Sequence, residues 1–203
     1  MSIQPLPALP QPIAVFDQFI TPYGDTLVVK EKLLDSFDIK NVAGQPILRV
    51  QGQLLSIHGR KTVTDMQGNH LFDIIKELLH WHATFVAEDK SQRKLLEVKS
   101  KFALLGSKAT ATFTNSRTGQ PVTLKMDGNW FDTSADIKDA ATGYVVARIQ
   151  RKLFNMREAI LGQQTYHLTI APGVDVAVIV AMAIALDEKN NEGKGGLVGG
   201  ILG

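Results

Sequence analysis

Basic residues at three places in the chain are the strongest candidates for chemistry, because Arg and Lys bind phosphate groups through charge and directed hydrogen bonds. Each of them lies on or beside a segment that we expect to be a strand. The candidates are Arg60, Lys61, Lys99, Lys101, Arg148, Arg151 and Lys152. If the order of the strands brings some of them together, they would clamp a phosphorylated headgroup. Otherwise they are dispersed surface charges that favour solubility.

Metal binding is the second chemistry that the residue types suggest. His80 and His82 are two residues apart, so a strand would place both imidazoles on one face, but the neighbouring sequence offers no clear third ligand. We therefore interpret them as surface residues beside Trp81, which would point to the core. The acidic stretches at 127–139 and 187–192 lack the loop spacing that wraps calcium. We expect neither a metal nor another cofactor.

Catalytic motifs are not recognisable in the chain. No strained, glycine-flanked serine turn and no glycine-rich phosphate loop before a helix is present. The chain has no Cys, which excludes thiol catalysis, disulfides and Cys-based zinc sites and suits a reducing compartment. We expect a protein that is not an enzyme and that works in the cytoplasm, at a membrane surface or in the nucleus.

Composition and chain ends indicate one domain with two short extensions. The chain has 203 residues, 44% of them hydrophobic, and a net charge of +2, which gives no broad electrostatic case for nucleic acid binding. Residues 1–12 carry four prolines and no secretory signal pattern, so we expect a flexible leader. Residues 193–203 are rich in Gly, so we expect a flexible tail. Residues 13–192 form the expected domain.

Alternating apolar and polar residues through the body of the chain predict short strands with one buried face. Examples are 46–51, 109–114, 145–150 and 166–170. Turn signals, an Asn or Asp followed by Gly, separate several of these runs, as at 41–44, 65–68, 115–119 and 139–143. The pattern predicts an antiparallel meander of eight or more strands, which must stack as two sheets or close into a barrel.

One apolar segment decides between these two architectures. Residues 176–186 are apolar without interruption, and their alanines and the preceding Asp175 favour a helix over about 174–189. Such a helix is about 22 Å long, too short for a hydrocarbon core of about 30 Å. Because it is apolar on every face, it must be surrounded on every face. We therefore predict a closed antiparallel β-barrel around a buried C-terminal helix.

Several stretches, in the same order, resemble the LURP-one-related family of the tubby C-terminal-like superfamily. They are Ile13–Asp17 with Pro22 and Tyr23, Phe37–Gly44, Val50–Arg60, and Asp175–Glu192. The resemblance implies a barrel of about twelve strands, a fold shared with tubby proteins and phospholipid scramblases. It implies no catalytic activity. It also implies an association with defence or signalling, and tubby domains bind phosphoinositide headgroups.

We therefore expect a binding or adaptor module that recognises anionic phospholipid headgroups, such as phosphoinositides, or a protein partner. This expectation includes no transmembrane span. The alternative is a scramblase-like, membrane-associated protein that uses Val176–Leu186 as a lipid anchor. Fold analogy alone cannot choose between the two.

Overall fold

The computed structural model describes residues 4–30, 37–52, 60–77, 83–102, 107–128, 134–151 and 165–186. Apart from one short 3₁₀ helix and a helix over residues 176–186, which we call the central helix, the regular structure in these ranges is strand. The elements in chain order are η1 (Asp17–Phe19), β1 (Ile20–Thr21), β2 (Asp25–Lys30), β3 (Phe37–Asn41), β4 (Pro46–Gly52), β5 (Lys61–Asp65), β6 (His70–Glu77), β7 (Ala83–Glu88), β8 (Lys94–Phe102), β9 (Ser107–Thr114), β10 (Pro121–Gly128), β11 (Ser134–Asp139), β12 (Val145–Arg151), β13 (Thr165–Ile170) and β14 (Val174–Asp175).

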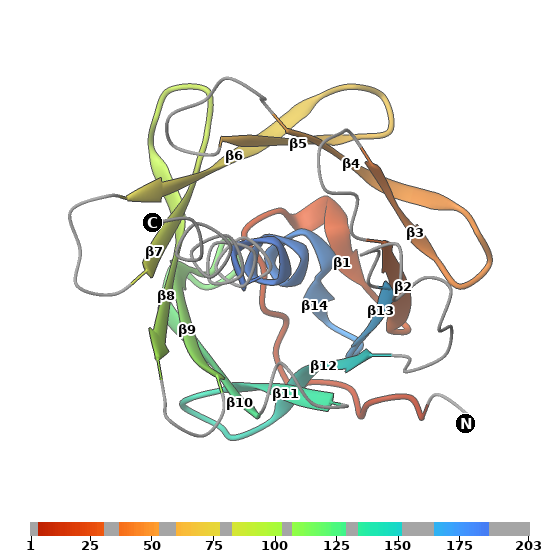
Figure 1. Ribbon diagram of the computed structural model, residues 1–203. Coiled ribbons are helices and arrows are strands. Elements are labelled where there is room, and N and C mark those ends of the chain that lie inside the picture. The colour runs from red at the N-terminus through yellow and green to blue at the C-terminus, as the bar shows by residue number, and fades with distance from the viewer. Residues whose placement is uncertain are drawn as a thin grey trace, which may run out of the picture.

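Twelve of these strands, β2 to β13, form a closed antiparallel barrel. Each strand pairs with its neighbours in the chain, and β13 pairs with β2 to complete the ring, as the view down the barrel shows (Figure 1). The short strands β1 and β14 form a separate two-stranded sheet. The predicted meander and closed barrel are therefore confirmed.

Inward-facing residues follow the predicted alternation. Leu48 and Val50 of β4 are fully buried, whereas Arg49 between them is exposed. The same pattern places Ala111 of β9 and Leu168 of β13 in the core. Because successive side chains of a strand point to opposite faces, each strand supplies one apolar wall segment to the interior.

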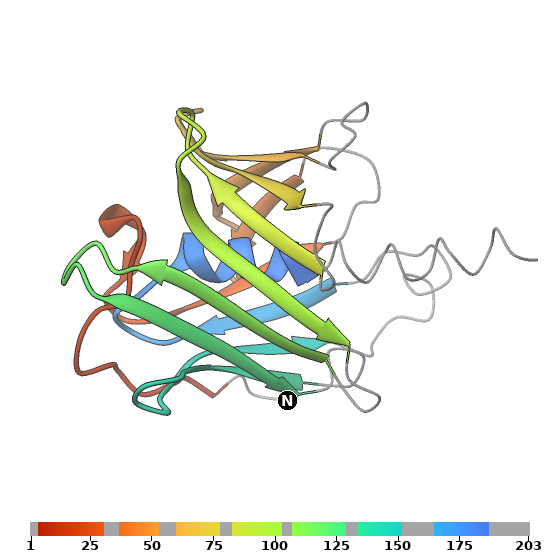
Figure 2. The same cartoon turned by 90° about the vertical axis from the view of Figure 1, so that its left-hand side faces the viewer.

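Tight turns close one end of the barrel, which we call the turn end. The turns after β3, β5, β9 and β11 are those predicted from the sequence, and in each a side-chain oxygen of Asn or Asp accepts backbone N–H groups. The turn after β7 was not predicted. It begins at Asp89 and carries a positive φ of 61° at Gln92, where the other turns have Gly. In Figure 2 the green β9–β10 turn and the red N-terminal segment lie together at this end.

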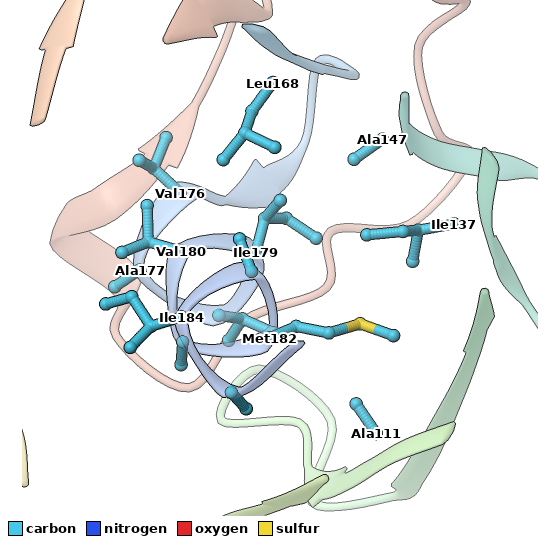
Figure 3. Packing of buried hydrophobic residues seen from close by; sticks show 14 of the residues in the cluster. Ala111, Ile137, Ala147, Leu168, Val176, Ala177, Ile179, Val180, Met182 and Ile184 are labelled. Atoms are coloured by element: carbon cyan, nitrogen blue, oxygen red, sulfur yellow. The ribbon is translucent and has the colours of Figure 1, made fainter. Parts of the chain in front are cut away.

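The central helix runs through the middle of the barrel (Figures 1 and 2). None of its described side chains is more than 4% exposed. Met182 extends toward Ala111 and Ile137 of the wall, while Val180 and Ile184 lie on the other side of the helix (Figure 3). The barrel and the helix therefore share one core.

The start of the central helix differs from the sequence prediction. The helix begins at residue 176, not 174, because Val174 and Asp175 pair with β1. Asp175 instead caps the helix, since its Oδ1 accepts the N–H of Ala177 at 2.7 Å. The predicted end near residue 189 lies outside the described residues.

The position of the central helix bears on the scramblase-like alternative. Val176–Leu186, the proposed lipid anchor, is enclosed by the protein's own strands. Among the described residues, no helix meets the length and apolarity needed to span a bilayer. An anchoring role for this segment is therefore contradicted by its burial.

The described part of the leader, residues 4–12, contacts the turn end. Leu6 is buried, the Leu9 N–H donates to the Pro172 carbonyl at 3.1 Å, and the Pro12 carbonyl accepts from the Asn115 amide at 2.9 Å. These contacts differ from the flexible segment expected from the prolines. Proline fixes φ and so lowers the entropy lost when an extended segment docks. The domain division at residue 12 remains a prediction.

Candidate functional site

The barrel order keeps the candidate basic residues on separate sectors of the wall. Arg60 and Lys61 belong to β5 or its start, Lys99 and Lys101 to β8, and Arg148 and Arg151 to β12. None of these strands is a neighbour of another in the ring. Lys152 lies outside the described residues.

Three of these residues already hold carboxylates. Arg60 Nη1 lies 2.6 Å from Asp73 Oδ2, and Lys99 Nζ lies 2.6 Å from Glu97 Oε1. Arg148 binds both oxygens of Asp136 across the β11–β12 pair, at 2.6 and 3.1 Å.

The electrostatic effects of two of these ion pairs are consistent with that geometry. The hydrogen bond with Asp136 raises the pKa of Arg148. Hydrogen bonds from Lys99 and Lys94 lower the pKa of Glu97. Exposed pairs of this kind contribute little stability, about 0–1 kcal/mol each.

Strand ends opposite the turn end, which we call the far end, carry three of the candidates. Lys61 is the first residue of β5, Lys101 is the next to last of β8, and Arg151 is the last of β12. Lys101 also pairs in register with Lys108 of β9. Basic residues therefore recur around the far end, although not in one cluster.

A polar cluster around Asp73 was not foreseen from the sequence. Asp73 accepts hydrogen bonds from Thr62 and Arg60, and His70 Nε2 lies 3.2 Å from its Oδ1. Burial alone would raise the pKa of Asp73, but the hydrogen bonds from Thr62, His70 and Arg60 leave that pKa below its ordinary value. The Thr62 hydroxyl donates to the carboxylate, so the cluster links β5 to β6.

A groove of about 720 Å³ lies at the turn end. One wall is the leader, residues 9–13, and the other comprises the turns at 115–123 and 139–144. Asp139 carries the one formal charge among the lining residues. Its Oδ1 accepts from the Ala141 N–H, and its Oδ2 accepts from the Thr142 hydroxyl at 2.6 Å. The groove therefore presents apolar, amide and hydroxyl groups and has no lining cation.

Exposed hydrophobic side chains also gather at the turn end. Among the described residues, the large ones are Tyr23, Val42 and Tyr144, at 91%, 59% and 44% exposure. All three belong to connections between strands at this end, and Tyr144 lines the groove. Apolar groups that gather on one part of a surface are typical of interaction sites.

Asn115 and Asp175 hold the leader and the following segment in place. Asn115 Oδ1 accepts the N–H groups of Ala14 and Arg117, while its amide donates to Pro12. Asp175 Oδ2 accepts the N–H groups of Val15 and Phe16 at 3.0 and 2.7 Å. Burial raises the pKa of Asp175 to about 6, against the lowering effect of these backbone bonds.

Potential metal ligands do not gather in the part of the chain that the structure describes. In the ranges that the structure describes, no group of three or more His, Cys, Asp or Glu residues could hold a metal ion. His80 and His82 lie outside those ranges. The expectation of no metal site remains a prediction.

Comparisons with known proteins agree with the observed architecture. The model of a family described as LURP-one-related matches residues 25–187. Protein LURP-one-related 15 of Arabidopsis thaliana is 21% identical over 189 residues, covering 89% of this chain and 87% of that protein. Protein LURP1 of the same plant is 24% identical over 179 residues, covering 85% of this chain and 86% of that protein.

A solved structure shares the fold. The crystal structure of an Arabidopsis thaliana protein has a TM-score of 0.63 and 17% identity, and the match covers 88% of this chain and 99% of that one. These matches confirm the resemblance drawn from the sequence.

Proposed function

Because the chain belongs to the LURP-one-related family, we propose that it is a non-enzymatic binding or adaptor module whose partner is a protein, acting in defence or signalling as the family resemblance implies. The partner docks on the outside of the barrel at the turn end. There the groove, the exposed Tyr144 and the leader form one continuous surface.

The observation that carries this proposal is the filled interior. The central helix occupies the space that a ligand would use in a hollow barrel, and its side chains have no more than 4% exposure. Small barrels that bind ligands inside keep that space open. A ligand of this barrel is therefore recognised by its outer surface.

Site-specific photo-crosslinking tests the proposal. A photoreactive amino acid replaces Tyr144 in the full chain, and in a control it replaces Gln67, an exposed residue of the β5–β6 turn outside the groove. In extract of the source organism, we expect a discrete protein adduct from position 144 and none from position 67. Adducts of equal yield at both positions, or none at either, contradict the proposal.

Recognition of an anionic lipid surface is the second candidate, and the recurrence of Lys61, Lys101 and Arg151 around the far end favours it. Flotation with vesicles of phosphatidylcholine, with and without phosphoinositide, tests it. Replacing these three residues by Ala should abolish flotation with phosphoinositide. Replacing Lys99 and Arg148, whose charges are paired, should leave it unchanged. Equal flotation with and without phosphoinositide contradicts this candidate. So does a loss of flotation when Lys99 and Arg148 are replaced.

A further inference from the structure

We infer that the groove at the turn end binds an extended, uncharged peptide segment of the partner. This inference rests on the proposed function and narrows it, because it names the part of the partner that the groove accepts.

The lining excludes a charged occupant. It contains no Lys, Arg, Glu or His, and both oxygens of Asp139 already accept hydrogen bonds within its own turn. A phosphate or an acidic side chain that entered would lose water and find no counter-charge. A basic side chain would meet only Asp139, and it would have to compete for that carboxylate with the hydrogen bonds from Ala141 and Thr142. The lining therefore fits an occupant without charge.

The leader shows what kind of chain this end of the barrel holds. It is an extended segment with prolines, bound through the Leu9 and Ile13 N–H groups to the carbonyls of Pro172 and Gly173 at 3.1 and 2.9 Å. Asn115 adds a side-chain amide bond to the Pro12 carbonyl. Backbone bonds supplemented by an amide are the same means by which grooves hold extended peptides. The groove lies directly beside this segment.

The groove also offers side-chain amides, and these are available to hydrogen-bond a bound peptide. The side-chain amides of Gln11 and Gln120 line it, and neither has a hydrogen-bond partner among the described residues. Pro10, Pro121 and the partly exposed ring of Tyr144 supply apolar contact. Proline-rich ligands dock on such surfaces because their extended backbone is already formed and loses little entropy on binding.

The dimensions and composition favour a peptide over a sugar. A volume of about 720 Å³ lies within the range of about 300–1,000 Å³ that is usual for ligand sites. Leu9, Ile13, Val122, Ala140 and Ala141 make much of the lining apolar. A sugar carries a hydroxyl on almost every carbon and would leave many of these groups without partners.

Selection from a phage-displayed library of random linear peptides tests the inference with the full chain as bait. We expect enriched peptides that lack charged residues and carry proline or other apolar residues. Calorimetry with a selected peptide should show an affinity loss of about tenfold or more for Tyr144→Ala and a smaller loss for Gln120→Ala. Tyr23→Ala and Gln67→Ala, which alter exposed residues outside the groove, should bind like the unaltered protein.

Three results would overturn the inference: no enrichment over an empty support, enrichment of charged peptides, or binding that Tyr144→Ala leaves unchanged. The same chain is applied to an immobilised glycan array, where binding that Tyr144→Ala removes would assign the groove to sugars. If position 144 gives a protein adduct but no peptide is selected, only the inference about a peptide is overturned. The proposed function would still hold, with a folded protein surface as the partner. Failure of both experiments would remove both proposals.

Discussion

Replacing Asp175 by Asn should destabilise the protein, and by an amount that grows as the pH falls. The carboxylate is fully buried and joins two parts of the chain: it caps the central helix through Oδ1 and holds Val15 and Phe16 through Oδ2. Asn keeps one oxygen for the cap but places an NH₂ donor where Oδ2 accepted two N–H groups. Each unsatisfied donor costs about 1–3 kcal/mol, so we expect about 2–4 kcal/mol of lost stability near pH 7, after allowing for partial exposure of the two N–H groups.

The pH dependence follows from the raised pKa of Asp175. A pKa of about 6, against an ordinary 3.8, means that the folded state binds this proton more tightly than the unfolded state. Proton binding to Asp175 therefore makes its full contribution to the free energy of unfolding below pH 3.8, and this contribution is lost as the pH rises through about 6. Between about pH 7 and about pH 5 the unaltered protein should gain about 1 kcal/mol from this group, toward about 3 kcal/mol at lower pH.

Urea unfolding followed by circular dichroism at the two pH values measures the difference between the proteins. Carboxylates with lowered pKa, such as Asp73 and Glu97, act in both proteins and cancel in the difference. Asp65→Asn is the control. The hydrogen bond from the Asn69 side chain lowers the pKa of Asp65, which therefore titrates below this window, and its stability difference should stay constant. The reasoning is refuted if Asp175→Asn lowers the free energy of unfolding by the same amount at both pH values.

Two further substitutions test the packing of the fold. Gly24→Ala should lower stability by about 2–4 kcal/mol, because Gly24 has a φ of 76° and a Cβ there would lie 2.8 Å from a backbone carbonyl oxygen. Gly44→Ala, with a φ of 81° in open space, should lose only about 1 kcal/mol in the same urea titration, and equal losses would contradict the crowding at Gly24. Ile179→Ala should lose about 2–5 kcal/mol by leaving a cavity between helix and wall, whereas the exposed Val42→Ala should change stability by less than about 0.5 kcal/mol. Thermal unfolding checks this pair, and similar melting temperatures would contradict the burial of the central helix.

Local pattern was sufficient to predict the strands and most of their turns, whereas closure of the barrel was predicted from the apolar segment 176–186. The alternation around Leu48 and Val50 and the turn signals at Asn41 and Asp65 act over a few residues, so they can be recognised without tertiary knowledge. The position of the central helix was predictable for a different reason. A helix that is apolar on all faces must be buried on all faces, and in a protein of strands a closed barrel provides that burial. The turn at Gln92 was missed because it reaches a positive φ without Gly or Asn.

The site depended on information that one sequence does not carry. The Arg148–Asp136 pair joins residues twelve apart whose meeting depends on strand register. The Asp73 cluster likewise depends on the register that places Thr62 opposite Asp73. The groove combines three segments that are far apart in the chain. Asp175 was assigned to the first helical turn on charge alone, and its bonds to Val15 and Phe16 required the three-dimensional structure.

Hydrogen exchange of the central helix tests most directly whether the apolar segment is the core of this barrel. Amides of residues 176–186 should be among the slowest in the protein and should exchange with the free energy of global unfolding, because the helix is reached by solvent only when the barrel opens. Adding phosphoinositide vesicles should leave their exchange unchanged. Exchange as fast as that of the exposed turn at 41–44, or protection that depends on vesicles, would contradict the account.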